Sequence, residues 1–221
     1  MKKEIITDNG IYSYEEVELF LGRKIIDQEL SKINVLDFKK VMDEHEIRYG
    51  LMFGTLLGAI REGGFIAWDE DVDIFVLEED RNKVLNALYD FEKVGFKVAR
   101  YRKKMDLLSI IRDGEYIDMY FFRKTFNRKR REGNFEIDAK YLEQSEKLEF
   151  FGEQFPVPIN PKQVLNILYG EDWHIPKKDV KPKLNTLNKR TKNFIIKRIP
   201  ILYKIYKAIW WNNSHVRTKS V

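Results

Sequence analysis

Three aspartates at alternating positions, directly before an apolar run, constrain this chain more than any other feature. Asp69, Asp71 and Asp73 fall within the segment WDEDVD, and residues 74–77 are Ile, Phe, Val and Leu. The apolar run predicts a buried strand, so Asp71 and Asp73 share one face, and Asp69 joins them if the strand begins early. Carboxylates held together repel unless a cation lies between them, and Mg²⁺ combines few carboxylates with phosphate oxygens. The run therefore predicts metal-assisted phosphoryl chemistry.

The composition sets the broad class of protein. With 221 residues, 43% of them hydrophobic and 15 of them Phe, the chain is long enough for one domain with a packed core. The lack of Cys excludes disulfides, thiolate nucleophiles and Cys-based zinc sites, and the three His are far apart in the sequence. No apolar stretch of signal-peptide length opens the chain, and no run of about 20 apolar residues occurs. We therefore expect a cytoplasmic protein.

The net charge of +5 is unevenly distributed along the chain. Residues 181–221 hold 11 Lys and Arg and no Asp or Glu, whereas residues 1–180 hold 29 basic and 35 acidic side chains. We expect a catalytic domain with N-terminal helices over 1–180 and a basic, apolar tail over 181–221. The tail predicts either an anionic partner, such as a membrane surface or a nucleic acid, or a solvated end.

The spacing of apolar residues predicts the local structure. Helical periodicity occurs over 14–21, 24–46, 79–93 and 161–169, and a last helix is expected over 194–211. Strand-like runs occupy 49–53, 96–101, 106–112, 115–122 and 147–158, with a turn at Asp113-Gly114. Residues 123–135 are basic and typical of a loop.

Two further segments complete a candidate site. Gly54 and Thr55 mark a strand-to-helix turn, with Thr55 as the expected N-cap, and a helix N-terminus favours an anion such as phosphate. Asp118 stands alone inside the apolar run 115–122, where an unpaired carboxylate is costly to bury. It either meets a cation or donor, lies at an exposed strand end, or is purely structural. In a site it would complete the metal shell or accept the proton of an attacking hydroxyl.

The order of these segments resembles the LicD family, which includes bacterial phosphocholine transferases and is related to fukutin and fukutin-related protein. Residues 54–74 read GTLLGAIREGGFIAWDEDVDI, which is similar to the signature of that family. Later blocks agree with its third-carboxylate strand and its C-terminal block: residues 116–119 read YIDM, residues 155–158 read FPVP, and residues 169–173 read YGEDW. The resemblance covers roughly residues 30–180.

The resemblance implies an α+β nucleotidyltransferase fold, with a mixed β-sheet flanked by helices and a C-terminal helical extension. It implies Mg²⁺, or Mn²⁺ in its place, held by Asp71 and Asp73 with Asp69 close by, and a catalytic role for Asp118. It also implies a CDP-activated donor, whose phospho-alcohol group passes to a sugar hydroxyl with release of CMP. The chain departs from the family at Glu62, where the family usually has His, which puts a donor contact at that position in question.

Arginines and aromatic residues are further candidates for donor binding. A guanidinium grips phosphate oxygens in bidentate fashion, so Arg61 inside the motif and Arg123 at the start of the basic run are candidates, although a solvated loop also explains the run. If the donor carries choline, its quaternary ammonium needs an aromatic box. The sequence offers Tyr49, Phe53, Tyr116 and Tyr120 for it.

These observations support one main hypothesis and two alternatives. The main one is a Mg²⁺-dependent phosphotransferase that moves a phospho-alcohol group from a CDP-alcohol to a cell-surface glycan or its lipid-linked precursor. Phosphocholine is the preferred candidate for the group, followed by ribitol phosphate or glycerol phosphate. Trp, Tyr and Lys within 194–211 favour peripheral contact with the inner face of the membrane, although a helix packed on the domain also fits. The alternatives are transfer of the nucleotidyl group to a small acceptor, and a nucleic-acid-binding module that uses the tail. Under the main hypothesis we expect no specific nucleic-acid partner.

Overall fold

The computed structural model describes residues 2–19 and 24–176 of the chain. All the described residues belong to one compact unit, Met1–Leu184. The basic tail and the helix expected over 194–211 lie outside the described residues. Among the described residues, no helix is long and apolar enough to span a bilayer.

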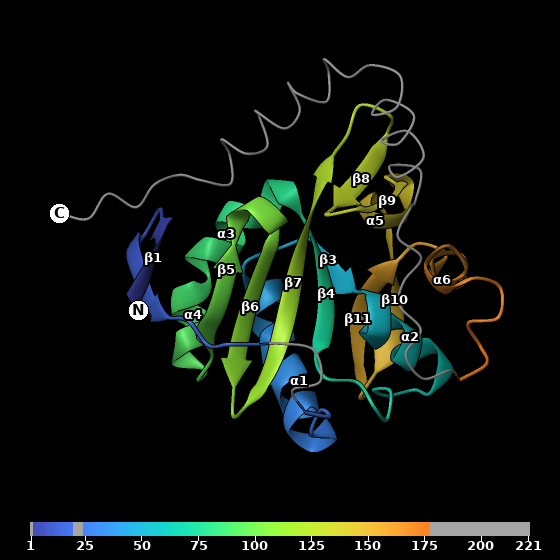
Figure 1. Ribbon diagram of the computed structural model, residues 1–221, viewed down its shortest axis with the longest axis horizontal. Helices are drawn as coiled ribbons and strands as arrows, with labels where there is room; N and C mark the ends of the chain where they lie inside the picture. The colour runs from blue at the N-terminus through green and yellow to red at the C-terminus, as the bar shows by residue number, and fades with distance from the viewer. Residues whose placement is uncertain (1, 20–23, 177–221) are drawn as a thin grey trace, which may run out of the picture. The chain divides into compact units, whose positions relative to one another are not determined.

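A mixed β-sheet forms the centre of the unit (Figure 1). Its strands run in the order β3-β4-β7-β6-β5, and β8 and β9 extend it from the end of β7. β4 and β7 are parallel, and the other neighbours are antiparallel. The strands are β3 (Tyr49–Leu51), β4 (Val72–Leu77), β5 (Lys97–Arg102), β6 (Leu107–Arg112), β7 (Glu115–Lys124), β8 (Lys129–Glu132) and β9 (Phe135–Asp138).

Helices and two hairpins surround this sheet. The helices are α1 (Gln28–Glu44), α2 (Phe53–Arg61), α3 (Arg81–Asn86), α4 (Leu88–Lys93), α5 (Lys140–Glu143) and α6 (Pro161–Tyr169), with 3₁₀ turns η1 (Glu78–Asp80) and η2 (Lys103–Met105). The hairpins are β1 (Lys2–Thr7) with β2 (Gly10–Glu15), and β10 (Ser145–Phe150) with β11 (Glu153–Pro158). The α+β fold with a mixed sheet, predicted from the sequence, is confirmed.

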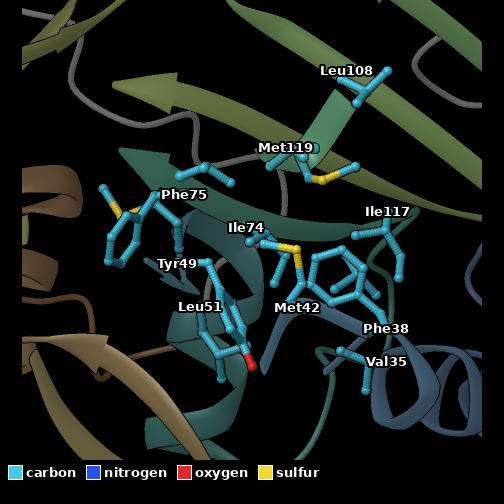
Figure 2. Packing of buried hydrophobic residues seen from close by; sticks show 14 of the residues in the cluster. Val35, Phe38, Met42, Tyr49, Leu51, Ile74, Phe75, Leu108, Ile117 and Met119 are labelled. Carbon is cyan, nitrogen blue, oxygen red and sulfur yellow. The ribbon is translucent and has the colours of Figure 1, made fainter. Parts of the chain in front are cut away.

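Helix α1 packs on one face of the sheet and leaves the other face to the aspartates. Its buried residues Phe38 and Met42 lie against Ile74 of β4 and Met119 of β7 (Figure 2). Because strand side chains alternate, the neighbouring residues of β4 and β7 point away from α1. Asp73 and Asp118 are among them. The apolar residues of α1 and the sheet thus fix the strands that position both carboxylates.

Several predicted elements are wrong: the β-segment predicted over 147–158 is the hairpin of β10 and β11, and the strand predicted over 49–53 ends at Leu51. Residues 10–15 form strand β2 and not the start of a helix over 14–21, because Tyr12 and Tyr14 alternate with exposed neighbours. Residues 123–135 are not one loop: they contain the end of β7, strand β8 and the first residue of β9, joined by two short turns. The helix predicted over 79–93 is η1 followed by two short helices that meet at Ala87.

Candidate active site

Four polar side chains form a row across the sheet, one from each of four neighbouring strands. Asp73 of β4 is the register partner of Asp118 of β7 in the parallel pair. Asp118 is in turn the partner of Ser109 in β6, and Ser109 is the partner of Arg100 in β5. Register partners on one face lie close enough for their side chains to interact. The fold therefore places two carboxylates, a hydroxyl and a guanidinium side by side.

Hydrogen-bond donors surround the Asp118 carboxylate, which is 2% exposed. Its Oδ2 accepts from Arg100 Nη2 at 2.8 Å and from the Tyr120 hydroxyl at 3.3 Å, and its Oδ1 accepts from the Ser109 hydroxyl. Of the alternatives open from the sequence, the exposed strand end is excluded. A cation and two hydroxyls accompany this carboxylate in the interior.

The N-terminus of α2 lies against Asp73. The Gly54 N–H donates to Asp73 Oδ2 at 3.0 Å, and the Thr55 hydroxyl accepts from the Asp73 N–H at 2.8 Å. The helix begins at Phe53 with Met52 as its N-cap, so the predicted capping role of Thr55 is wrong. Thr55 instead joins the first turn of α2 to the backbone of β4. The positive end of the helix thereby faces a carboxylate.

Gly54 is also the point where two carboxylates approach one backbone. A Cβ on Gly54 would lie 2.8 Å from Asp69 Oδ2 and 3.3 Å from Asp73 Oδ2. Contacts below 3.0 Å do not occur for real Cβ atoms. Phe53, one residue earlier, has a φ of 44° in the left-handed region, which is uncommon for an aromatic residue. The turn before α2 is thus shaped so that backbone and carboxylates fit closely together.

Burial raises the pKa of all four aspartates in this cluster. Burial is the main cause for Asp71 and Asp73, whose pKa values lie well above the usual range, and the charges of the neighbouring aspartates raise them further. A hydrogen bond from Tyr116 opposes the shift of Asp71. Burial raises the pKa of Asp69 to about 6, although a backbone hydrogen bond from Glu70 lowers it. For Asp118 burial outweighs Arg100, and the pKa is raised.

The donor set of this cluster fits a divalent cation. Buried Asp69 Oδ2 has no hydrogen-bond partner, and the carboxylates repel each other in the absence of a positive charge. Within the described part of the chain, no three acidic or His side chains form a complete metal-binding group. Mg²⁺ needs only one or two protein carboxylates when phosphate oxygens supply other ligands. Asp71 and Asp73, with Asp69 close by, are the residues that would hold it.

The two predicted phosphate-binding arginines have protein partners. Arg61 donates to Glu62 Oε1 through Nε and Nη2 and to the Trp173 carbonyl at 3.2 Å, and its side chain is 10% exposed. Arg123 pairs with Asp106 at 3.2 Å and is half exposed. Among the described residues, Arg100 brings its guanidinium to the carboxylate cluster, and no motif in the sequence pointed to it.

Three of the four aromatic residues proposed for donor binding lie at the carboxylate cluster. Tyr116 and Tyr120 contact Asp71 and Asp118 respectively, and Phe53 packs edge-on to Tyr120 with ring centroids 5.1 Å apart. Tyr49 instead donates to Asp43 of α1 and does not belong to the site. Tyr169 of α6 is a further missed residue: burial raises its pKa, the charges of Asp73 and Asp69 add to the shift, and Arg61 lowers it.

The parallel carboxylate strands, the short helix aimed at one of them and the mixed sheet define a nucleotidyltransferase-type domain. The chain belongs to the family described as LicD/FKTN/FKRP, nucleotidyltransferase domain, whose profile matches residues 46–160. This match confirms the predicted family and its nucleotidyltransferase domain.

Relatives match the chain over limited segments. Lipopolysaccharide cholinephosphotransferase LicD of Haemophilus influenzae is 36% identical over 64 residues, which are 28% of this chain and 24% of that protein. An uncharacterized protein of Rickettsia typhi is 32% identical over 88 residues, which are 40% of this chain and 27% of that protein. The matched segments thus span about a quarter of these relatives.

Two solved structures align with the chain at low sequence identity. The solution structure of antibiotic-resistance factor ANT(2'')-Ia has a TM-score of 0.49 and 13% identity, and the match covers 85% of this chain and 97% of that one. Lincosamide adenylyltransferase LnuA with bound lincomycin has a TM-score of 0.44 and 15% identity, and the match covers 69% and 96% of the two chains.

Proposed function

We propose that the protein is a divalent-metal-dependent phosphotransferase. It moves a phospho-alcohol group from a CDP-activated donor to a hydroxyl of a cell-surface glycan or its lipid-linked precursor. Membership of the LicD/FKTN/FKRP family supports this proposal, as does the name of the Haemophilus relative, a lipopolysaccharide cholinephosphotransferase. Mg²⁺ is the first candidate metal and Mn²⁺ the second. Choline is the first candidate for the alcohol, and ribitol or glycerol is the second.

One observation carries the proposal: Asp73 and Asp118 are register partners on adjacent parallel strands, with the Gly54 N–H at Asp73. Asp71 and Asp73 would hold a divalent ion, which would supply positive charge to the donor's diphosphate. The N-terminal turn of α2 offers backbone N–H groups and a positive dipole to the same phosphates. Asp118 lies beside this position, where an acceptor hydroxyl would approach.

The proposed transfer forms one bond at phosphorus and breaks another, and a residue of the site takes up the proton. The acceptor oxygen forms a bond to the phosphorus that carries the alcohol, and the bond from that phosphorus to the bridging oxygen of CMP breaks. The bond electrons leave with CMP. Asp118 accepts the proton of the acceptor hydroxyl, for which its raised pKa is suited.

The aromatic residues beside the carboxylates support choline as the first alcohol. Phe53 and Tyr120 pack edge-on next to Asp118, and Tyr116 lies at Asp71. A quaternary ammonium is attracted to aromatic faces, whereas ribitol and glycerol need hydroxyl partners. A lipid-linked acceptor would suit a cytoplasmic enzyme with peripheral membrane contact through residues 194–211.

A screen of CDP-alcohols tests the proposal. CDP-choline, CDP-ribitol and CDP-glycerol are each added with Mg²⁺, and the melting temperature and the release of CMP are measured. We expect one donor to stabilise the protein and to yield CMP in the presence of a glycan acceptor. Appearance of a nucleotide-modified acceptor would instead support nucleotidyl transfer. Nucleic-acid binding that weakens steeply with salt and persists in Asp73→Asn would support the third alternative.

A further inference from the structure

Arg100 is held at three points on the carboxylate face of the sheet. Its Nη1 donates to the Leu19 carbonyl at 3.2 Å, its Nε to the Ser109 hydroxyl at 2.8 Å, and its Nη2 to Asp118 Oδ2 at 2.8 Å. An arginine fork fixed in this way has one orientation. The Arg100 side chain is 21% exposed, so its contact with Asp118 is largely shielded from water.

Residues 16–19, which lie outside the family-matched residues 46–160, support this arrangement. Val17 N donates to the Ala99 carbonyl at 2.8 Å, which lays residues 16–19 alongside β5. Leu19 packs with Ala99 and Tyr116. The carbonyl that holds Arg100 is therefore itself fixed by main-chain and apolar contacts. This degree of support exceeds what a surface ion pair requires.

The environments of the carboxylates differ in one respect. Asp118 accepts from a guanidinium and two hydroxyls, whereas Asp73 accepts from the Gly54 N–H and Asp71 from Tyr116. A fixed positive charge in contact with Asp118 repels a dication at that oxygen, and the donors occupy most of its lone pairs. A divalent ion is then directed to Asp71 and Asp73. Asp118 keeps one lone-pair direction on Oδ1 for another partner.

We propose that Arg100 is a positioning residue that fixes the Asp118 carboxylate and reserves it for the proton of the acceptor hydroxyl, leaving the divalent ion to Asp71 and Asp73. This inference rests on the proposed function and states what keeps Asp118 in the proton-accepting role and out of the metal shell. Ser109 is the second support, because it bonds both Arg100 and Asp118.

Direct Mn²⁺ binding tests the division of roles without any turnover. Mn²⁺ dissociation constants are measured by electron paramagnetic resonance for the wild type, Asp73→Asn, Asp118→Asn and Arg100→Gln. We expect Asp73→Asn to weaken binding at least about tenfold, and Asp118→Asn to leave it within about twofold. Arg100→Gln should bind Mn²⁺ as tightly as the wild type or more tightly, because a nearby positive charge is removed. Loss of Mn²⁺ affinity in Asp118→Asn equal to that in Asp73→Asn would overturn the inference.

Turnover tests the positioning role. With the donor found by the screen, Arg100→Gln should lower kcat about 10- to 100-fold and change the donor KM by less than about twofold. The kcat of Arg100→Lys should lie between those of Arg100→Gln and the wild type. This variant replaces Arg100→Gln in the test if the Gln variant does not fold. Arg102→Gln is the matched control, since Arg102 lies on the same strand and pairs with Glu16. Adding Arg100→Gln to Asp118→Asn should cost nothing further, because both changes disrupt one unit.

The two proposals fail separately. If Arg100→Gln retains the kcat of Arg102→Gln, or costs as much in the Asp118→Asn background as alone, the positioning role is wrong while the phosphotransferase stands. If the wild type releases no CMP from any CDP-alcohol, the proposed function fails, and the Mn²⁺ titrations still decide between the two roles of Asp118.

Discussion

At the scale of single residues, Asp73 carries the largest conflict between stability and function. It is buried, its neighbours are Asp69, Asp71 and Asp118, and its pKa is raised well above the usual range by burial first and by their charges next. Such a group destabilises the folded state when it is ionised. Its retention in the core is explained by a ligand that needs the charge.

We predict that Asp73→Asn lowers turnover at least about 100-fold and leaves the melting temperature at pH 7.5 unchanged or higher. The Asn side chain has the shape of Asp but carries no charge. The stability of the folded state should therefore rise or stay the same, while the cation site is lost. Asp37→Asn is the control: Asp37 pairs with Lys40 and Arg112, far along the chain from the cluster, and its loss should cost stability but not activity. A normal rate in Asp73→Asn would contradict the metal-binding assignment.

Glu132 gives a pH-dependent prediction away from the metal-binding residues. Burial raises its pKa to about 7, the charge of Asp106 adds to the shift, and Arg123 opposes it. Because the folded state binds the proton more tightly than the unfolded state, stability from this group is full below about pH 4.5 and falls as pH rises toward 7. Glu132→Gln should therefore raise the unfolding free energy at pH 8 by about 1 to 3 kcal/mol and change it little at pH 5.

Glu79 supplies a control of opposite sign for this titration. Burial would raise its pKa, but hydrogen bonds from Arg130 and Lys124 outweigh burial and lower the pKa to about 2. Glu79→Gln should lose stability at pH 8. Chemical unfolding curves at both pH values measure the two effects, and a stability loss at pH 8 in Glu132→Gln would contradict the assigned shift.

At the scale of elements, the N-terminal turn of α2 couples backbone and site. We predict that Gly54→Ala folds with near-normal stability, because Ala suits a helix better than Gly. The new Cβ would displace the Asp69 and Asp73 carboxylates, so turnover and Mg²⁺ affinity should fall. In Gly58→Ala the Cβ would meet the Gly64 carbonyl at 2.5 Å, so this variant should lose stability instead. Thermal unfolding and CMP release distinguish the two, and full activity in Gly54→Ala would rule out a close fit at this turn.

Elements with plain apolar periodicity were predictable, and the failures have physical causes. The predicted turn at Asp113-Gly114 does join β6 and β7 as an antiparallel pair. In the register that this turn sets, Ser109 lies opposite Asp118. The basic run 123–135 concealed β8, because Arg130 is 1% exposed and is compensated by Glu79 and Glu143, which lie far from it in the sequence. Burial of a paired charge leaves no hydropathy signal.

The candidate site was predictable in part for similar reasons. Alternation and the family resemblance named the aspartates, but the parallel register of Asp73 with Asp118 depends on a crossover whose geometry the sequence does not state. Arg100 required the register of β5 on β6, which contains a bulge between Val98 and Arg100. An irregular step of this kind changes which residues share a face. Arg100 was missed for that reason.

At the scale of the whole molecule, the charge of the cluster couples ligand binding to folding. Mg²⁺ at about 100 times its dissociation constant should stabilise the folded state by about 2.7 kcal/mol. The effect should be smaller at pH 5 than at pH 7.5, because the Asp69 pKa of about 6 means that a proton competes with the ion at the lower pH. Melting curves with Mg²⁺ and with chelator at both pH values measure it. Equal stabilisation of wild type and Asp73→Asn would place the ion elsewhere.

The central claim is that carboxylates from β4 and the segment before it hold a divalent ion that clamps an activated diphosphate. Calorimetric titration of the wild type and of Asp73→Asn with the CDP-alcohol, in Mg²⁺ and in chelator, tests this claim most directly. We expect the wild type to bind the donor in Mg²⁺ but not in chelator, and Asp73→Asn to bind it in neither condition. Equally tight binding of the donor in chelator, or by the variant, would contradict it.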